Sequence, residues 1–488
     1  MLRLANFIDN QHLPPASGDY LDVFEPAAGA AYASVPLSDA ADVDLAAAAA
    51  RRAFPGWSAT PASERSRLLF RLADLIDANL DVLAHAESRD TGKPIALARG
   101  VDIPRSATNF RFFAGAVLHG AGEFHETDQP AVGAPLHALN YTLRRPRGVA
   151  GLISPWNLPL YLLSWKIAPA VATGNTCIAK PSEVTPLTAH MLGSLVAQAG
   201  IPPGVINIVH GDGRSCGSAI VEHPAVPAVS FTGSTGVGRW IASAAGQRLK
   251  RVSLELGGKN PFIIFPDADL DGAIATALRA AFTNQGQVCL CGSRLLVHRS
   301  VLPRVLDGLL AGVGNLRPGD PSDPATNFGA LVSRPHLEKV AGIVDLARSL
   351  GATIHCGGRP PASLPARCRG GFFYEPTIIS GLDATCSVER DEIFGPVVTI
   401  QPFDTDEEAL SLANATDYGL AASVFTSDLS RAHRLAEQLH AGVIWINCWM
   451  VRDLRTPFGG MKASGVGREG GAEALRFFTE PRNVCIRI

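Results

Sequence analysis

Four segments of the chain carry residue types that could do chemistry: PWN at 155–157, FTGSTGVG at 231–238, LELGGK at 254–259 and NQGQVCLCGSR at 284–294. In the last of them, Cys289 is a candidate nucleophile, because a thiolate adds readily to a carbonyl carbon. Such a cysteine needs surroundings that lower its pKa. A cysteine of unknown context is more often a small core residue. Cys291 is the obvious rival, and two cysteines at this spacing make no closed zinc site without further ligands.

Glu255 and Asn157 could assist such a nucleophile. Glu255 lies in VSLELGG, an apolar stretch ending in two glycines, where a solvated glutamate would be out of place. Burial raises the pKa of a carboxyl group, which suits it to act as a general base. Asn157 follows a proline and a tryptophan after an apolar stretch, and its amide could donate to a developing oxyanion. An ordinary turn asparagine is the alternative interpretation.

The glycines of GSTGVG at 233–238 are spaced differently from the GxGxxG fingerprint of dinucleotide-binding proteins. They stand between a predicted strand, AVSF, and a predicted helix that begins near Val237. Such a junction presents the N–H groups of a helix start to a phosphate. The segment is therefore a candidate pyrophosphate site, although a lone glycine cluster could be only a turn.

These segments fall in a regular alternation of short apolar strands and helices. We predict strands at 148–154, 175–180, 205–211, 228–234, 251–258 and 261–265. We predict helices at 46–53, 62–88, 164–172, 185–200, 216–222, 237–245 and 270–283. Alternation of this kind indicates parallel sheets with helices on both faces. A chain of 488 residues is too long for one core, so we expect two such doubly wound α/β units.

Two segments alternate polar and apolar residues like exposed strands, namely 133–147 and the tail 483–488. Exposed strands invite association unless they are paired. Pairing with a partner subunit predicts a homo-oligomer, a dimer or a tetramer, and pairing within the chain is the alternative.

The composition excludes several classes of protein. Lys and Arg total 43 against 45 Asp and Glu, so the basic excess of a nucleic-acid-binding surface is missing. The nine cysteines show no paired spacing, which indicates reduced thiols in the cytoplasm. The most apolar stretch, 152–163, is interrupted by two prolines and an asparagine, so we expect no membrane span. Asp9 and the prolines at 14–15 come too early for the apolar region of a signal peptide, so we expect none.

The four segments, together with KPSE at 180–183, EIFGP at 392–396 and PFGGMKASGVGRE at 457–469, resemble the aldehyde dehydrogenase superfamily. The resemblance runs from about residue 20 to the C-terminus, with seven motifs in the family's order. It implies Cys289 as nucleophile, Glu255 as the base that activates water, and Asn157 with the N–H of the nucleophile as oxyanion donors. All three are present, which argues against a non-catalytic protein on this fold.

The resemblance also implies NAD as cofactor and no metal. Lys180 and Glu183 match residues that hold the adenosine ribose, and a carboxylate there repels the 2′-phosphate of NADP. Ser234 would lie near the phosphates, Glu392 at the nicotinamide ribose and Phe394 beside the nicotinamide ring. The remaining residues of the expected cofactor site are Ser154, Pro155, Trp156, Ser182, Gly213, Phe231, Thr232, Gly233, Val237 and Leu256.

Two arginines, Arg105 and Arg452, stand where family members usually place apolar residues of the substrate funnel. A guanidinium is costly to bury unpaired, so two of them indicate a carboxylate on the aldehyde and exclude a cationic one. Leu158 and Trp165 are the other expected substrate contacts. The alternative is that the arginines pair with nearby acids such as Asp102 or Asp453.

Several phrases, among them DIPRS, CLCGSR and VRDLRTPFGG, resemble the branch of the family that oxidises 2-aminomuconic 6-semialdehyde and 2-hydroxymuconic semialdehyde. CLC favours the amino substrate, and a general aldehyde dehydrogenase of broader range is a further alternative. The resemblance implies a cofactor domain of residues 1–122 and 146–256 and a catalytic domain of residues 257–458. Bridging strands at 123–145 and 473–488 would join subunits.

Overall fold

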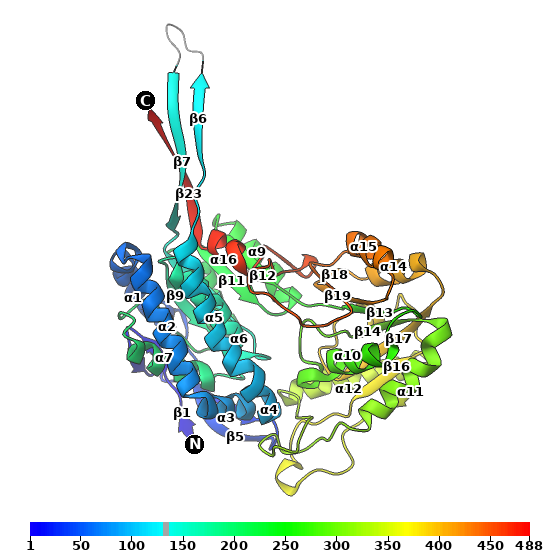
Figure 1. Ribbon diagram of the computed structural model, residues 1–488. Coiled ribbons are helices and arrows are strands. Elements are labelled where there is room, and N and C mark those ends of the chain that lie inside the picture. The colour runs from blue at the N-terminus through cyan, green and yellow to red at the C-terminus, as the bar shows by residue number, and fades with distance from the viewer. Residues whose placement is uncertain (130–135) are drawn as a thin grey trace.

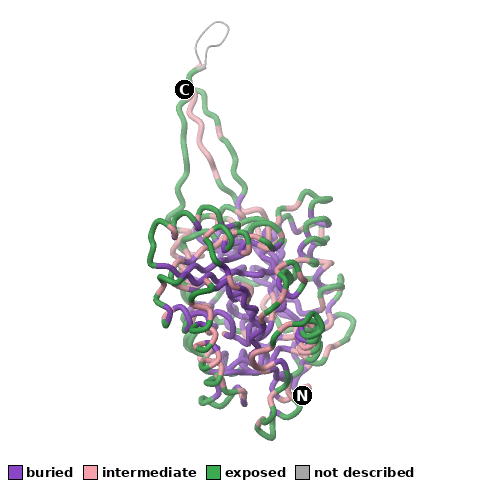
Figure 2. Tube along the Cα trace, turned by 90° about the vertical axis from the view of Figure 1, so that its right-hand side faces the viewer, coloured by how far each residue is buried: buried purple, intermediate pink, exposed green. Residues whose placement is uncertain are grey.

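The computed structural model describes residues 1–129 and 136–488. Two α/β lobes stand side by side, and a long β-ribbon projects from the lobe that contains the N-terminus (Figure 1). The buried residues gather inside the lobes, whereas the ribbon is largely exposed (Figure 2).

The first lobe is built on an eight-stranded sheet in the order β22-β12-β11-β8-β9-β10-β2-β3. Its parallel strands are β8 (Val149–Ile153), β9 (Thr176–Lys180), β10 (Ile206–Ile208), β11 (Ala228–Thr232) and β12 (Arg251–Glu255). Antiparallel strands β2 (Asn6–Ile8), β3 (Gln11–Leu13) and β22 (Gly465–Val466) extend the edges. The chain moves outward from β8 to β10 and then returns to place β11 against the other side of β8. This reversal opens a ligand crevice at the carboxyl ends of β8 and β11.

Helices cover both faces of this sheet: α1 (Ala40–Ala59), α2 (Ala62–Ala78), α3 (Leu80–Thr91), α5 (Ile103–Ala116), α6 (Pro159–Ala172), α7 (Leu187–Ala199), α8 (Ser218–Glu222) and α9 (Thr235–Gly246). A small sheet of β1 (Leu2–Arg3), β4 (Tyr20–Glu25) and β5 (Ala30–Pro36) lies beside them.

Three predicted helices have clearly different bounds. The helix expected at 46–53 runs over Ala40–Ala59, with the Asp39 side chain capping its start. The helix expected over 62–88 is interrupted at Asn79, whose side chain donates to the Leu75 carbonyl at 2.8 Å and so competes with the helical pattern. The helix expected at 164–172 begins earlier, at Pro159, because proline is tolerated in a first turn.

The second lobe contains a seven-stranded sheet in the order β15-β16-β17-β14-β13-β19-β20. The strands are β13 (Pro261–Ile264), β14 (Arg294–His298), β15 (Thr353–Cys356), β16 (Thr377–Ser380), β17 (Val397–Phe403), β19 (Ala421–Phe425) and β20 (Val443–Ile446), and only β15 is antiparallel. Its helices are α10 (Leu270–Phe282), α11 (Leu302–Val313), α12 (Arg334–Ser349), α14 (Asp406–Asn414) and α15 (Leu429–Gln438). The predicted fold class, two doubly wound α/β units with a small β element, is confirmed.

The ribbon consists of β6 (Phe124–Gln129), β7 (Leu136–Pro146) and β23 (Thr479–Arg487), with β7 in the middle and both neighbours antiparallel to it. The two segments predicted as exposed strands thus pair with each other inside one chain. Residues 133–135 of the first segment lie outside the described residues. The outer strands β6 and β23 each pair with β7 on one side only, so their other edges could pair with a second subunit. The homo-oligomer stays a prediction, and so do the domain boundaries.

The nine cysteines are all free thiols. In the described ranges, 1–129 and 136–488, no helix is long and apolar enough to cross a membrane. The same residues contain no cluster of three or more metal-ligating side chains.

Candidate active site

Cys289 lies in the loop between α10 and β14, directly after a turn of unusual conformation. Asn284, Gln285 and Gly286 have φ values of 52°, 54° and 71°, which makes three consecutive left-handed residues. Backbone strain of this kind is typical of active sites and ligand-binding sites. The Asn260 Nδ2 then holds the loop by donating to the carbonyls of Cys289 at 2.7 Å and Cys291 at 2.8 Å.

Glu255, the last residue of β12, lies beside the Cys289 thiol and is 2% exposed. Burial and the charge of Glu469 raise the pKa of Glu255 to about 7, while a hydrogen bond with the thiol lowers it. Lys166 Nζ, 2.8 Å from Glu469 Oε1, also favours the carboxylate form. A carboxylate with this pKa can accept a proton at neutral pH.

The expectation of a lowered thiol pKa is wrong. Burial and the negative charges of Glu255 and Glu392 raise the pKa of Cys289 well above its usual value, although Arg452 opposes them. The thiol therefore rests protonated, and Glu255 is the group placed to receive its proton.

Asn157, in the loop after β8, is 2% exposed and reaches the nucleophile loop. Its Nδ2 donates to the carbonyl of Gln287 at 2.9 Å, and its own carbonyl accepts from Asn284 Nδ2 at 3.0 Å. The two loops, one from each lobe, are therefore tied together at the point where an oxyanion on the substrate would form.

A cavity of about 230 Å³ connects these groups to the first part of the expected cofactor site. Of the predicted residues it is lined by Pro155, Trp156, Asn157, Thr232, Gly233, Ser234, Leu256, Cys289, Glu392 and Phe394. A second, largely apolar cavity of about 420 Å³ includes the predicted Gly213, Phe231 and Val237. The two cavities lie on either side of the start of α9.

The start of α9 fits a pyrophosphate. Ser234 is the N-cap residue, and its side chain makes no capping hydrogen bond, so the hydroxyl and the first N–H groups of the helix can meet an anion. A Cβ at Gly238 would come within 2.4 Å of the Leu256 side chain, so glycine lets this helix pack closely against the segment after β12 without moving that side chain. The buried hydroxyl of Ser154 has no protein partner in the described part of the chain.

Of the two carboxylates predicted to bind ribose, Glu392 lines the first cavity, whereas Glu183 lines neither of the two. Lys180 Nζ lies 3.2 Å from Glu183 Oε2, with Ser182 between them in sequence. Glu392 Oε1 accepts from the Gly258 N–H at 2.9 Å, and burial raises its pKa. The ring of Phe394 lies edge-on to Trp156 with centroids 5.1 Å apart.

Arg105 and Arg452 approach the same aromatic side chains. Arg105 lies over Tyr161 and Trp165, and Arg452 lies over Trp165 and Phe458. Arg452 Nη1 also contacts the Tyr161 hydroxyl at 3.4 Å. The pKa of Arg105 is lowered by burial, with the charge of Arg452 contributing.

Neither arginine forms an ion pair with a carboxylate of residues 1–129 or 136–488. Asp102 pairs with Lys93 instead, and Asp453 pairs with Arg455. The alternative in which these acids neutralise the two arginines is therefore wrong. Arg105 Nη2 is buried without a partner in the described part of the chain. Leu158 packs with Tyr161 and Leu162 at the start of α6.

Sequence reasoning missed several residues of the two cavities. The first is also lined by Leu162, Gly257, His336 and Lys339, and the second by Ile153, Arg214, Gly217, Ser218, Val221, Gly236, Trp240 and Ile241. Trp240 could have been found, because it lies one helical turn after Val237. His336 and Lys339 come from α12 and carry no local signal.

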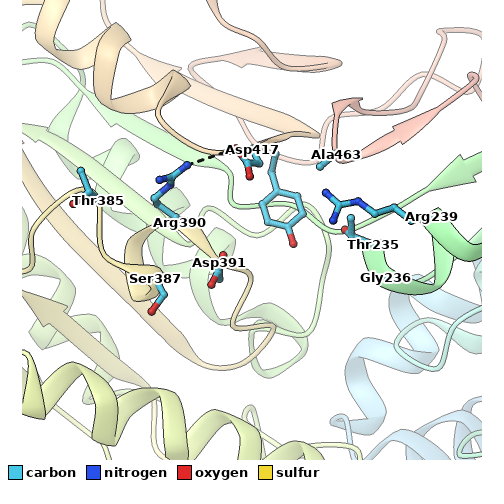
Figure 3. A pocket seen from close by; sticks show the side chains of 10 residues that line it. Thr235, Gly236, Arg239, Thr385, Ser387, Arg390, Asp391, Asp417 and Ala463 are labelled. Carbon is cyan, nitrogen blue, oxygen red and sulfur yellow. Dashed lines mark ion pairs between the residues drawn. The ribbon is translucent and has the colours of Figure 1, made fainter.

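A third cavity, of about 560 Å³, opens between the lobes and does not contain the nucleophile (Figure 3). Both basic and acidic side chains line it, and the Arg390 guanidinium lies 3.5 Å from the Asp417 carboxylate (Figure 3). Arg239, Arg390, Asp391 and Asp417 are exposed, so solvent screens them. The larger volume therefore does not mark the catalytic centre.

A thiol beside a buried carboxylate, in a cavity that includes residues of the expected dinucleotide site, is the arrangement that an oxidoreductase with a cysteine nucleophile would need. The aldehyde dehydrogenase family model matches residues 13–484, and the chain belongs to this family. The resemblance found in the sequence is thereby confirmed.

Relatives and solved structures agree with this assignment. The chain is 51% identical to a 2-aminomuconic semialdehyde dehydrogenase of Danio rerio, over 100% of the chain and 98% of the relative. It is 47% identical to a 2-hydroxymuconic semialdehyde dehydrogenase of Pseudomonas sp. (strain CF600), over 100% of both. The crystal structure of an indole-3-acetaldehyde dehydrogenase complexed with NAD+ matches with a TM-score of 0.95 and 40% identity, over 100% of the chain and 97% of that structure's chain.

Proposed function

We propose that this enzyme uses NAD to oxidise 2-aminomuconic 6-semialdehyde to 2-aminomuconate. In the balanced reaction, the aldehyde, NAD+ and water give the carboxylate, NADH and two protons. The observation that carries the substrate assignment is the pair Arg105 and Arg452, two guanidinium groups without a carboxylate partner among the described residues. A substrate carboxylate would supply the missing anion. The curated relatives named for muconic semialdehydes support this choice.

The first half of the reaction uses three side chains. Glu255 takes the thiol proton of Cys289, and the thiolate adds to the aldehyde carbon to form a thiohemiacetal. Asn157 Nδ2 and the backbone N–H of Cys289 donate hydrogen bonds to its oxyanion. Collapse of the thiohemiacetal breaks its C–H bond, and NAD, when bound, would supply the hydride acceptor. A thioester on Cys289 remains.

The second half releases the acid. Glu255 first releases the thiol proton to solvent and then removes a proton from water, whose oxygen attacks the thioester carbon. The C–S bond breaks, the proton held by Glu255 passes to the sulfur to restore the thiol, and the acid product loses the second proton. The raised pKa of Glu255, about 7, suits both proton transfers.

The residues that would hold NAD are taken from the two cavities and from the family motifs. Val237, Trp240 and Val221 would enclose the adenine, and Ser234 with the α9 start would meet the pyrophosphate. Lys180 and Glu183 would hold the adenosine ribose, and Glu392 the nicotinamide ribose. The carboxylate of Glu183 favours NAD over NADP, because it would repel a 2′-phosphate.

Two finer points belong to the same proposal. The ribbon of β6, β7 and β23 would join subunits in a homodimer or homotetramer, and the enzyme would act in the cytoplasm. The second candidate substrate is 2-hydroxymuconic semialdehyde, which carries the same terminal carboxylate. A general aldehyde dehydrogenase would not need the two arginines.

The substrate assignment is tested with Arg105→Met and Arg452→Met. Each variant should raise KM for the muconic semialdehyde at least about tenfold, as expected for a lost charge-assisted contact of about 1.5–3 kcal/mol. KM for a neutral aldehyde of similar size should change little. The measurement is NADH formation with enzymatically generated amino and hydroxy semialdehydes, compared side by side.

The matched control is Arg455→Met, because Arg455 is exposed and already paired with Asp453. It should leave both KM values unchanged. Equal losses for the neutral and the carboxylated aldehyde in the Arg105 and Arg452 variants would contradict the carboxylate assignment.

A further inference from the structure

Lys93 is a buried lysine whose side chain reaches the loop that carries Asn157. It follows Gly92, the left-handed residue (φ 74°) that ends α3, and its side chain is 0% exposed. The ammonium forms an ion pair with Asp102 and donates a hydrogen bond to the Asn157 backbone oxygen at 3.0 Å. Taking an ammonium out of water costs several kcal/mol, so these two contacts must both compensate the charge.

The acceptor of that hydrogen bond is part of the connection between the two catalytic loops. The Asn157 oxygen also accepts from Asn284 Nδ2 at 3.0 Å, and Asn284 belongs to the left-handed turn before Cys289. Asn157 Nδ2 donates in turn to the Gln287 carbonyl at 2.9 Å. The Asn157 carbonyl oxygen therefore accepts hydrogen bonds from both sides, from Lys93 of the first lobe and from Asn284 of the nucleophile loop.

The partner of Lys93 extends the connection to the substrate arginine. Asp102 ends a π-helical turn, Ala98–Asp102, which runs directly into α5, and Arg105 is the third residue of α5. Single π turns inside helices occur frequently at functional sites. One ammonium thus contacts the start of the helix that presents Arg105 and the loop that presents Asn157.

We propose that Lys93 is a positioning residue, which holds the Asn157 side chain where its amide meets the oxyanion formed on Cys289. The proposal rests on the proposed role of Asn157. A hydrogen-bond donor helps an oxyanion only at the correct distance, and a misplacement of about 1 Å can cost about a hundredfold in rate. A charged donor to the Asn157 backbone limits such displacement, because charge-assisted hydrogen bonds are stronger than neutral ones.

The test is a double-mutant cycle with Lys93→Met and Asn157→Ala. The reaction measured is hydrolysis of 4-nitrophenyl acetate without NAD, which needs the nucleophile and the oxyanion donors but no hydride acceptor and no substrate carboxylate. Asn157→Ala should lower kcat about a hundredfold or more, and Lys93→Met about tenfold or more. Lys93→Met should then have no further effect in the Asn157→Ala protein, because residues that act through one another are not additive.

Two controls separate positioning from folding. Lys250 also donates to two backbone carbonyls, those of Val221 and His223, both at 2.6 Å, and lies away from the nucleophile. Lys250→Met should leave ester hydrolysis unchanged. The rate at which iodoacetamide alkylates Cys289 should also be unchanged in Lys93→Met, because the thiol and Glu255 are untouched.

The outcomes are distinct. Additive losses in the cycle, or an unchanged kcat in Lys93→Met, would overturn the role of Lys93 while leaving the proposed reaction intact. An unchanged kcat in Asn157→Ala would instead overturn the oxyanion role and the inference with it. If Lys93→Met does not fold, Asn284→Ala removes the other donor to the same oxygen and should show the same non-additivity with Asn157→Ala.

Discussion

The proposed chemistry depends on Cys289 and Glu255 acting together, because the protonated thiol needs a base beside it. The pKa of Cys289 is raised by burial and by nearby carboxylates, and burial raises the pKa of Glu255 to about 7. A protonated thiol is unreactive, but a carboxylate in contact with it can remove the proton when the aldehyde arrives. In the proposed reaction, the nucleophile would therefore stay in its less reactive form until Glu255 takes its proton.

The pH dependence of the enzyme should report Glu255. Its folded-state pKa lies above the usual 4.5, so the carboxylate form is lost as the pH falls through about 7. We expect kcat/KM to rise between about pH 6 and 8 and then to level. Glu469→Gln should move the midpoint to lower pH, because it removes the negative charge that raises the pKa of Glu255. Stopped-flow measurement of NADH across this range checks both.

Glu473→Gln is the control for this series, since Glu473 is half-buried and pairs with Arg476. It should leave the midpoint in place. A midpoint that does not move in Glu469→Gln would contradict the electrostatic coupling of the two glutamates.

At the scale of elements, the left-handed turn Asn284–Gly286 directs the nucleophile loop. Asn284 and Gln285 adopt a conformation that is costly for residues with side chains, and Gly286 lies against the chain at Gly395. The turn follows α10 and stops its helical path. The loop then accepts a hydrogen bond from Asn260 at the Cys289 carbonyl, and Cys289 lies next to Glu255 at the end of β12.

Gly286→Ala should disturb this turn. The added Cβ would lie 2.1 Å from the Gly395 carbonyl oxygen, so the backbone must shift, and the positive φ adds strain. We expect kcat to fall at least about tenfold and stability to fall by about 1–3 kcal/mol. Gly56→Ala, inside α1 with open space around it, should stabilise by about 0.5–1 kcal/mol. Thermal unfolding and NADH formation would measure both effects, and equal behaviour of the two variants would argue against the role of the turn.

At the scale of the whole molecule, the ribbon is the feature that a single chain does not explain. It stands away from both lobes (Figure 1), and Phe124 and Ile488 at its strands are 67% and 73% exposed. Open strand edges and exposed apolar side chains are features that proteins normally cover. Their arrangement supports the proposed homo-oligomer.

Removal of residues 479–488 should therefore lower the oligomeric state. It takes away β23, which pairs with β7 over Thr479–Arg487, and leaves β7 unpaired on one side. Light scattering should show a smaller particle than the intact enzyme. Cys485→Ser keeps the ladder and should leave the mass unchanged. An unaltered mass after the deletion would show that the subunits meet elsewhere.

Much of the fold followed from local patterns. Apolar strands alternating with helices specify parallel sheets whatever the distant contacts are, and they predicted β8, β9, β11 and β13 within a residue or two. The helix over 62–88 was divided because one asparagine bonded to its own backbone. The family motifs predicted the residues around the catalytic cavity, because each motif is a short, contiguous stretch of sequence.

Tertiary structure alone decided the electrostatics and the long-range partners. Only the folded chain shows that Lys93 forms an ion pair with Asp102, so that Asp102 does not pair with Arg105. Only the folded chain shows, likewise, that His336 and Lys339 of α12 line the cavity that contains Cys289. Burial also reversed the expected shift of the Cys289 pKa. Residue types and their spacing thus determined the class of chemistry, because they are properties of the chain. Desolvation and pairing depend on residues distant in sequence, so only the fold could determine them.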